Sequence, residues 1–443
     1  MNAPERLYPA YNADSLANIE RAKRKGNEAH MKKQYSTAIT EYTKGLSYIT
    51  MNGAPMAEPV SDPGKLIAQL YSNRSACYLL ERKYDKALAD GKEAAKHLRW
   101  YKPWFRQGEA WLALNEYEKA LEAFNEAMKL VGPAAANEPA ENVRRGRVAQ
   151  IQKRITKAKI KMEDRSLGLC LHQLSPGGGD ICSSHSFSPV RNLVYSYARK
   201  MGNYIYLIEN IASKECLLVD ACWDIDGILA YAKHEKLKIV GAVVTHYHID
   251  HVGGIPPPPF DIPGVRVDGL AKLLKKLPDA SAYVNPADIP GIVKANPEIS
   301  VDRFISTEDY GTMCLPMSLN GGTKSKPTSQ QSGGRTTALQ FIHTPGHTPG
   351  SQCILVNGNR LLSGDTLFIR SCGRVDFPDS DVMHMYHSLQ LKLATLPDDV
   401  CIFPGHDYNG EMGLIGDEKR EGLLKPLDRE TFRKAMADTS ADE

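Results

Sequence analysis

Residues 239–254 read IVGAVVTHYHIDHVGG, and this stretch decides the fold of the second half of the chain. Its first six residues are apolar or glycine, which is typical of a buried strand, and its final glycine pair is typical of a turn. Between strand and turn stand four residues that can bind a metal ion: His246, His248, Asp250 and His251. A metal site needs several imidazoles and carboxylates that converge on one point. We therefore predict a metal-binding loop at the end of a strand.

The same order of strand, tight turn and candidate ligand recurs downstream. The later stretches are TALQFIHTPGHTPGS (337–351) with His347, RLLSGDTLF (360–368) with Asp365, and VCIFPGHDY (400–408) with His406. Upstream, NYIYLIEN (203–210) and ECLLVDA (215–221) predict a pair of strands. Because functional residues often lie on loops held by a rigid scaffold, we predict a sheet-based domain whose loops build one site.

In this order, over about residues 200–420, the motifs resemble the metallo-β-lactamase superfamily and, within it, the glyoxalase II-like branch. The resemblance implies an αββα sandwich with two divalent metal ions, for which we expect zinc first and iron or manganese as alternatives. It assigns one ion to His246, His248 and His347. It assigns the other to Asp250, His251 and His406, with Asp365 bridging the two. We take Asp250 and Asp365 as the catalytic carboxylates.

A metal pair of this kind implies hydrolysis without a protein nucleophile, because the ions can both generate a hydroxide and hold a developing oxyanion. The resemblance therefore implies a metallo-hydrolase that uses a dinuclear-site hydroxide. Its substrate would be a small-molecule thioester such as an S-acylglutathione.

The stretch GDTLFIRSCGRVDFPDS (364–380) also resembles the persulfide dioxygenases of the same fold. Those enzymes use a single Fe(II), for which the matching ligands here are His246, His347 and Asp365. Two histidines and one carboxylate leave positions open for oxygen and a thiolate. We favour the hydrolase, and the dioxygenase stays open as the alternative. Arg374 and Asp376 of this stretch are predicted to pair and to shape the loop below Asp365.

The first part of the chain repeats itself. Residues 19–49, 66–98 and 101–131 each predict two short amphipathic helices with a break between them. Each unit places a small residue twelve positions before an alanine, in the pairs Gly26 and Ala38, Ser75 and Ala87, and Gly108 and Ala120. Small residues let two helices approach closely, and stacked helix pairs bury the apolar faces that one pair leaves exposed.

These units resemble the tetratricopeptide repeat. Five polar residues on the first helices of the units further resemble the carboxylate clamp of chaperone-docking repeat domains: Lys23, Asn27, Asn73, Lys102 and Arg106. The resemblance implies that they bind the carboxylates of a chaperone C-terminal acidic peptide. A second alternative for the whole chain is a non-catalytic, co-chaperone-like adaptor.

We therefore expect a multidomain protein in which α-helical tetratricopeptide repeats precede the αββα sandwich. The expected boundaries are 15–133 for three repeats, 138–165 for a capping helix, 166–189 for a flexible linker, and 190–430 for the metallo-β-lactamase domain with a disordered insertion near 318–335.

Charge and cysteine usage limit the remaining possibilities. The net charge is only +3, so we expect no nucleic-acid partner, although residues 1–165 carry 29 Lys and Arg against 20 Asp and Glu. The nine cysteines contain no Cys-x-x-Cys pair, which argues against a disulfide framework and a thiolate zinc site. No stretch is apolar enough for a signal core or a membrane span. We therefore expect a cytoplasmic protein without a membrane partner.

Overall fold

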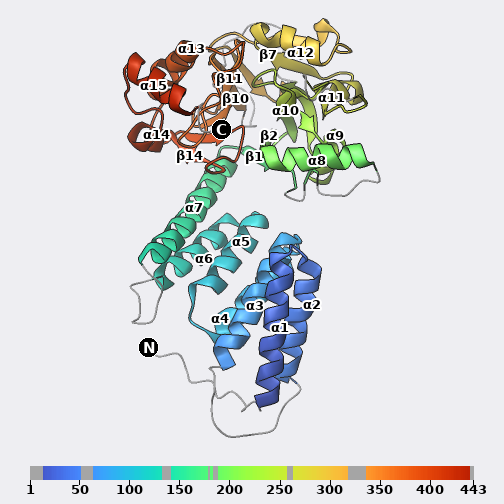
Figure 1. Ribbon diagram of the computed structural model, residues 1–443, viewed down its shortest axis with the longest axis vertical. Helices are drawn as coiled ribbons and strands as arrows, with labels where there is room; N and C mark the ends of the chain where they lie inside the picture. Colours follow the sequence, from blue (N-terminus) through green and yellow to red (C-terminus); the bar gives the residue numbers. More distant parts are fainter. Residues whose placement is uncertain are drawn as a thin grey trace. The chain divides into compact units, whose positions relative to one another are not determined.

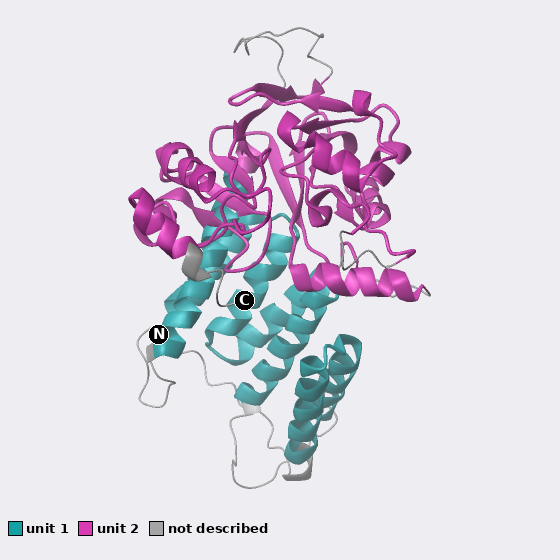
Figure 2. Cartoon of the chain, turned by 45° about the horizontal axis from the view of Figure 1, so that its top comes forward, with its two compact units in different colours: residues 1–163 teal, residues 164–443 magenta. Residues whose placement is uncertain are grey.

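A computed structural model describes residues 13–50, 63–131, 141–177, 180–182, 188–256, 263–317 and 336–439. The chain divides into two compact units, Met1–Glu163 and Asp164–Glu443, which are coloured separately in Figure 2. The insertion predicted near 318–335 lies outside the described residues.

The first unit is built from helices. They are α1(Ala13–Met31), α2(Tyr35–Thr50), α3(Pro63–Leu80), α4(Tyr84–His97), α5(Tyr101–Ala113), α6(Tyr117–Leu130) and α7(Glu141–Ser166), of which α7 continues across the boundary (Figure 1). The first six form three successive helix pairs, as the repeats predict.

The small residues of the repeats lie where the two helices of a pair meet. A side-chain carbon added to Gly26 would lie 2.4 Å from the ring of Tyr42, and one added to Gly108 would lie 2.5 Å from the ring of Phe124. In the middle pair, the hydroxyl of Ser75 donates to the carbonyl of Ala87 over 2.7 Å. Each pair therefore depends on a small residue at its crossing point.

Helix α7 covers the last helix pair of the first unit. Its residues Ile151, Ile155 and Ala158 are buried in one apolar cluster with Phe105 and Phe124. The cluster gives the outer face of this pair the packing that a further repeat would otherwise supply.

The second unit contains two six-stranded sheets. The first sheet has the order β1-β2-β3-β5-β7-β8 and consists of β1(Leu169–Leu174), β2(Ile205–Asn210), β3(Glu215–Val219), β5(Lys238–Val243), β7(Ser281–Val284) and β8(Phe304–Ser306). The second has the order β14-β13-β12-β11-β10-β9 and consists of β9(Thr312–Leu315), β10(Thr337–His343), β11(Gln352–Val356), β12(Arg360–Gly364), β13(Cys401–Pro404) and β14(Gly413–Leu414). A separate short ladder joins β4(Cys222–Trp223) to β6(Asp268–Gly269).

Helices pack against each sheet. With the first sheet lie α8(Pro189–Met201), α9(Ile225–His234), α10(Ile249–Val252), α11(Leu270–Lys276), η1(Pro286–Asp288), α12(Ile289–Ala295) and η2(Val301–Arg303). With the second lie α13(Val382–Tyr386), η4(His387–Lys392), η5(Leu393–Thr395), α14(Ile415–Glu421) and α15(Arg429–Thr439) (Figure 1).

The two sheets face each other between these helical layers. Alternate residues of β2 differ in their neighbours: Ile205 and Leu207 pack in the helix-side core, whereas the hydroxyl of Tyr206 donates to the carbonyl of Pro404 in the other sheet over 2.6 Å. Both faces of β2 are therefore buried, as expected for an inner layer. The second unit is the predicted αββα sandwich.

The prediction of a flexible linker over 166–189 is wrong for residues Leu169–Leu174. They form β1, which pairs antiparallel with β2 and buries Leu169, Leu171 and Leu174. The glycines and prolines that suggested a linker begin only after this strand. The linker ends at Ser188, whose hydroxyl accepts the amide of Arg191 and caps α8.

No helix among the described residues is long and apolar enough to cross a membrane.

Candidate metal centre

The loop of residues 246–251 is held at the end of the inner strand β5. Thr245 donates its amide and its hydroxyl to the two carboxylate oxygens of Asp220, each over 2.8 Å. The loop ends in α10 and then in Gly253, which has a positive φ of 68° and passes close to Gly269. A side-chain carbon on Gly253 would lie 2.5 Å from the Cα of Gly269, so this turn requires glycine.

The remaining candidate ligands come from the second sheet. His347 follows β10, Asp365 follows β12, and His406 follows β13. Gly346 has a positive φ of 147°, and its Cα lies so close to the backbone of Met385 that a side chain would collide. The structure thus brings all seven predicted ligands together, from loops at the ends of strands in both sheets.

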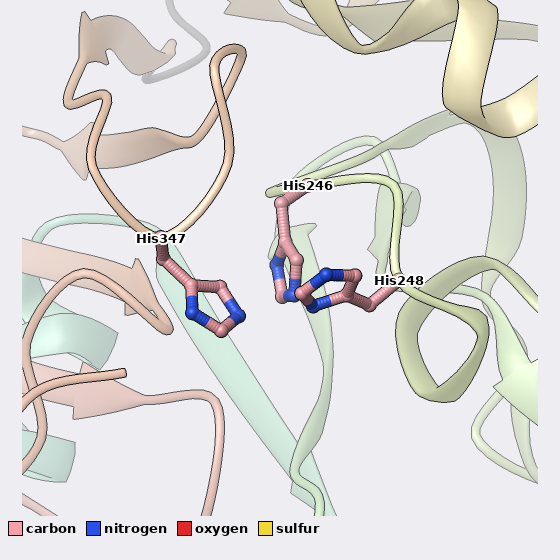
Figure 3. A group of neighbouring side chains, drawn as sticks. All are labelled: His246, His248 and His347. Atoms are coloured by element: carbon pink, nitrogen blue, oxygen red, sulfur yellow. The ribbon is translucent and has the colours of Figure 1, made fainter. Parts of the chain in front are cut away.

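The ligand atoms form two groups. In the first, those of His246, His248 and His347 lie within 4.8 Å of one another, and Figure 3 shows their rings turned toward one space. In the second, Nε2 of His251 lies 3.2 Å from Nε2 of His406, and each lies 3.4 Å from Oδ2 of Asp250.

Asp365 lies between the two groups. Its Oδ2 is 4.0 Å from Nε2 of His246 and 3.5 Å from Nε2 of His347 in the first group. It is also 3.4 Å from Nε2 of His406 in the second group, and Oδ1 is 3.4 Å from Nε2 of His251. This carboxylate can therefore reach ions in both positions.

Hydrogen bonds on the far side of the rings orient the histidines. Nδ1 of His347 donates to the carbonyl of Arg374 over 2.7 Å, and Nδ1 of His406 donates to the carbonyl of Met201 over 2.8 Å. A carbonyl oxygen only accepts, so Nδ1 carries a hydrogen and Nε2 is the ring atom turned toward the centre. Nδ1 of His251 lies 2.8 Å from Asp220, which orients that ring similarly.

The residues present fit a bound cation. Nε2 of His246, Nε2 of His347 and Oδ1 of Asp365 are buried and have no hydrogen-bond partner among the described residues. Buried polar atoms left in this state cost free energy, and three of them converge here. Nitrogen and carboxylate oxygen atoms in this combination suit zinc, iron or manganese.

The carboxylates and the first group of imidazoles are in the protonation states that bind a cation. Burial lowers the pKa of His248 to about 4 and that of His246 well below the ordinary value, so both rings are neutral at neutral pH. Burial raises the pKa values of Asp250 and Asp365, but the surrounding imidazoles outweigh it and hold both well below the ordinary value. Burial lowers the pKa values of His251 and His406, but the carboxylates of Asp250 and Asp365 outweigh it and raise both well above the ordinary value. The first group therefore offers neutral imidazoles, whereas an ion in the second group would displace protons from His251 and His406.

Three supporting residues were not predicted from the sequence: Asp220, Asn203 and Asp288. Asp288 accepts hydrogen bonds from the amide of Tyr247 over 3.0 Å and from the hydroxyl of Thr348 over 2.8 Å, so it joins the two histidine loops. Asp220 ends one strand-like run and Asn203 begins another, which could have marked both, whereas Asp288 stands in no recognisable motif.

Aromatic side chains border the centre. The ring of Phe377 lies 5.3 Å from that of His248, and the ring of Tyr408 stacks on His406 at 4.8 Å. Tyr408 is 53% exposed, whereas His406 beneath it is 1% exposed. The predicted pair is present, since Arg374 donates to Asp376 over 2.9 Å, and it lies beside Phe377.

In the first unit, the structure brings two of the five predicted clamp residues into direct contact. Nδ2 of Asn73 donates to Oδ1 of Asn27 over 3.0 Å, and Oδ1 of Asn27 also accepts from the hydroxyl of Tyr42. On the same helix as Asn27, Lys23 donates to Gln69 of α3 over 3.0 Å. These contacts place Lys23, Asn27 and Asn73 on adjoining surfaces of α1 and α3.

The other two clamp residues form a cationic pair on α5. Burial, and then the charge of Arg106, lower the pKa of Lys102. Burial also lowers the pKa of Arg106, and its Nε is buried without a hydrogen-bond partner among the described residues. Within that part of the chain neither cation has a carboxylate bound to it, because the carboxylate of Glu109, whose charge acts on Arg106, is bound to Arg154.

Comparison with known proteins yields two family matches. Residues 199–406 match the metallo-beta-lactamase superfamily, and residues 101–132 match the tetratricopeptide repeat.

Relatives with assigned names fall into more than one class. A probable polyketide biosynthesis zinc-dependent hydrolase of Bacillus velezensis is 27% identical over 52% of this chain and 83% of its own length. The persulfide dioxygenase of Mus musculus is 27% identical over 61% of this chain and 87% of its length. A hydroxyacylglutathione hydrolase of Shewanella halifaxensis is 30% identical over 46% of this chain and 62% of its length.

The fold, the histidine and carboxylate loops and these matches agree with one another. In the first unit, the match to the tetratricopeptide repeat agrees with the helix pairs. The chain belongs to the metallo-beta-lactamase superfamily and carries tetratricopeptide repeats ahead of that domain.

Proposed function

We propose that the second unit is a metal-dependent hydrolase of a thioester such as an S-acylglutathione, and that it binds two divalent ions. The observation that supports it is the position of Asp365, whose carboxylate is within 4.0 Å of imidazole nitrogens in both groups. A carboxylate in this position suits a bridging ligand, and a bridge is needed only if both groups bind an ion.

The ligands would bind the two ions in two groups. His246, His248 and His347 would hold one ion, and Asp250, His251 and His406 would hold the other. When bound, two such ions supply a hydroxide at neutral pH and stabilise negative charge on a carbonyl oxygen. The chain then needs no nucleophilic side chain of its own, and its ionised carboxylates keep the centre's charge balanced.

The walls of the centre would orient the substrate. Phe377 lies beside the first group of histidines and Tyr408 beside His406, so an extended substrate would lie between two aromatic side chains. The Arg374 side chain is 57% exposed, lies over the ring of Phe377 and is paired with Asp376.

A mononuclear iron persulfide dioxygenase is the second candidate function. It is favoured by the extent of the similarity, because the match covers 87% of the persulfide dioxygenase but 62% of the hydroxyacylglutathione hydrolase. His246, His347 and Asp365 would then hold the single iron ion.

Metal content and product analysis of the full chain distinguish the two candidates. The hydrolase predicts two zinc, iron or manganese ions per chain and release of free thiol from S-lactoylglutathione. One iron ion with oxygen uptake on glutathione persulfide would contradict the hydrolase and support the dioxygenase. A chain that binds no metal and turns over neither substrate would support the remaining alternative, a non-catalytic adaptor.

For the first unit we propose that it docks an acidic C-terminal peptide, such as the tail of a chaperone. The supporting observation is the pair Lys102 and Arg106, two cations on one helix without a bound carboxylate among the described residues. Asn27 and Asn73 would add amide contacts to the same peptide, and Lys23 a further charge.

Titration of the full chain with a peptide that ends in acidic residues tests this docking. Arg106→Ala is expected to weaken binding by about tenfold to a hundredfold, because a hydrogen bond between charged groups is lost. Lys129→Ala is the matched control, since Lys129 on α6 is exposed and already paired with Glu126. Equal affinity of the Arg106→Ala variant and the unmodified chain for the peptide would contradict the proposed clamp.

A further inference from the structure

Asn203 lies where the two sheets of the second unit approach the second group of ligands. It stands between α8 and β2, next to the loop that carries His406. The backbone of this segment is bonded to that loop, because the amide of Tyr204 donates to Gly405 over 2.7 Å and the amide of Asp407 donates to Gly202 over 2.9 Å. Asn203 itself is 1% exposed.

The side-chain amide of Asn203 forms hydrogen bonds with Asp250 and Trp223. Nδ2 donates to Oδ2 of Asp250 over 3.0 Å and to the backbone carbonyl of the same residue over 3.2 Å. Oδ1 accepts from the indole Nε1 of Trp223 over 3.1 Å. Since an indole nitrogen only donates, this bond fixes which end of the amide faces Asp250.

The same nitrogen is close to the other ligands of the second group. It lies 3.4 Å from Nε2 of His251 and 3.3 Å from Nε2 of His406. The nitrogen is therefore within hydrogen-bonding distance of all three ligand side chains of the second group, and its shortest contact holds the carboxylate of Asp250 beside the two imidazoles.

The backbone around Trp223 is strained in a way that serves this arrangement. Trp223 has a φ of 69°, in a region that residues with bulky side chains rarely adopt, and Asp220 has a φ of 58°, in the same region, which aspartate adopts more readily. Trp223 directs its indole to Asn203, and Asp220 directs its carboxylate to His251. Strain of this kind persists where the surrounding structure requires a particular side-chain position.

We propose that Asn203, held by Trp223, is the positioning residue that sets the affinity of the second metal position, formed by Asp250, His251 and His406. This inference rests on the two-metal centre of the proposed function. The first position, formed by His246, His248 and His347, has no contact with Asn203 among the described residues and should not depend on it.

The test is a zinc titration of the metal-depleted full chain in a zinc buffer, with ions per chain as the readout. The unmodified chain is expected to bind two ions. Asn203→Ala should bind the first with unchanged affinity and the second about tenfold to a hundredfold more weakly, the range known for residues that support metal ligands. The visible spectrum of the Co²⁺-loaded variant should lose the contribution of the Asp250, His251 and His406 position.

Two further variants distinguish a positioning role of Asn203 from a general loss of packing in the sandwich. Trp223→Phe removes the indole donor and keeps an aromatic ring, so it should weaken binding of the second ion in the same direction. It provides the test if Asn203→Ala does not fold. Asn210→Ala is the matched control, because Asn210 is equally buried and bonds to Ser213 and Thr337, away from the ligands. Asn210→Ala should keep both affinities.

Each result has a distinct meaning. If the unmodified chain binds two ions and Asn203→Ala binds both with the same affinity, the inference is wrong and the proposed function stands. An equal loss in the Asn210→Ala variant would likewise overturn it, since any buried amide would then have the same effect. If the unmodified chain binds only one ion, both the two-metal centre and the inference fail.

Discussion

Asp365 is the residue on which both groups of ligands converge. It is 8% exposed, one of its oxygens faces imidazoles of both groups, and Gly405 passes so close that an added carbon there would lie 2.4 Å from Oδ1. Gly373 likewise passes beside its carbonyl. The backbone is thus packed around Asp365, so a side chain at Gly405 or Gly373 would collide with it.

Replacing Asp365 with asparagine should test its role at this scale. An amide has the same shape but lacks the negative charge, so metal binding should weaken and turnover fall by more than about 100-fold, beyond the usual effect of outer residues. Metal content and initial rates are the measurements, and Asp398→Asn, an exposed carboxylate, is the control. Peptide binding by the repeats should not change, and retained turnover would exclude Asp365 as a ligand.

Asp288 should give the second unit a measurable dependence on pH. Burial raises its pKa from 3.8 to about 6, so between these values the folded protein keeps a proton that the unfolded chain has lost. Its contribution to the free energy of unfolding is therefore largest below pH 4, falls as the pH rises, and is about 3 kcal/mol smaller above pH 6.

The variant Asp288→Asn should lack this pH-dependent contribution to the free energy of unfolding. We expect the difference in thermal midpoint between Asp288→Asn and the unmodified chain to change between pH 4 and 6 and to be constant above pH 7. A difference that stays the same across this range would show that the carboxyl group does not titrate there.

At the scale of elements, the helix pairs of the first unit depend on their crossing points. Gly108→Ala would place a carbon 2.5 Å from the ring of Phe124, so α5 and α6 must move apart. We expect a loss of about 1–3 kcal/mol in the free energy of unfolding of this unit, as for other overpacked sites. Gly146→Ala on α7 is the control, because no atom lies within 4 Å of the added carbon and alanine favours helix.

The elements could be predicted wherever a pattern is local. The helix pairs follow from small residues at a fixed spacing, and the ligand loops follow from histidines placed directly after apolar runs. Strand β1 could not be predicted, because its burial depends on pairing with β2 more than 30 positions later and glycines and prolines follow it. Asn203 and Asp288 were missed for the same reason, since the residues of the ligand loops to which they bond are 41 or more positions away.

At the scale of the whole molecule, the two units have separate apolar cores. Leu70 and Tyr42 lie in a core of the repeats, whereas Leu218 and Leu361 lie in the two cores of the sandwich. Units with their own cores commonly unfold in separate transitions. A ligand that binds only one folded unit should then stabilise only that transition.

Calorimetry of the full chain with and without a chelator tests this independence. Removal of metal should lower the midpoint of the sandwich transition and leave that of the repeat transition unchanged. An acidic peptide should have the converse effect and raise only the repeat transition. A chelator that moved both midpoints equally would show that the units unfold together.

The ligands come from loops of both sheets, so bound ions would affect how firmly the two sheets are held together. Each expected ion takes two ligands from the loop of residues 246–251, on the first sheet, and a third from His347 or His406, on the second. Such an ion is a cross-link between the two layers, with a strength set by coordination rather than by apolar packing. Loading the centre would then suppress the parting of the layers, and amide hydrogens at their shared edge would exchange more slowly with solvent deuterium.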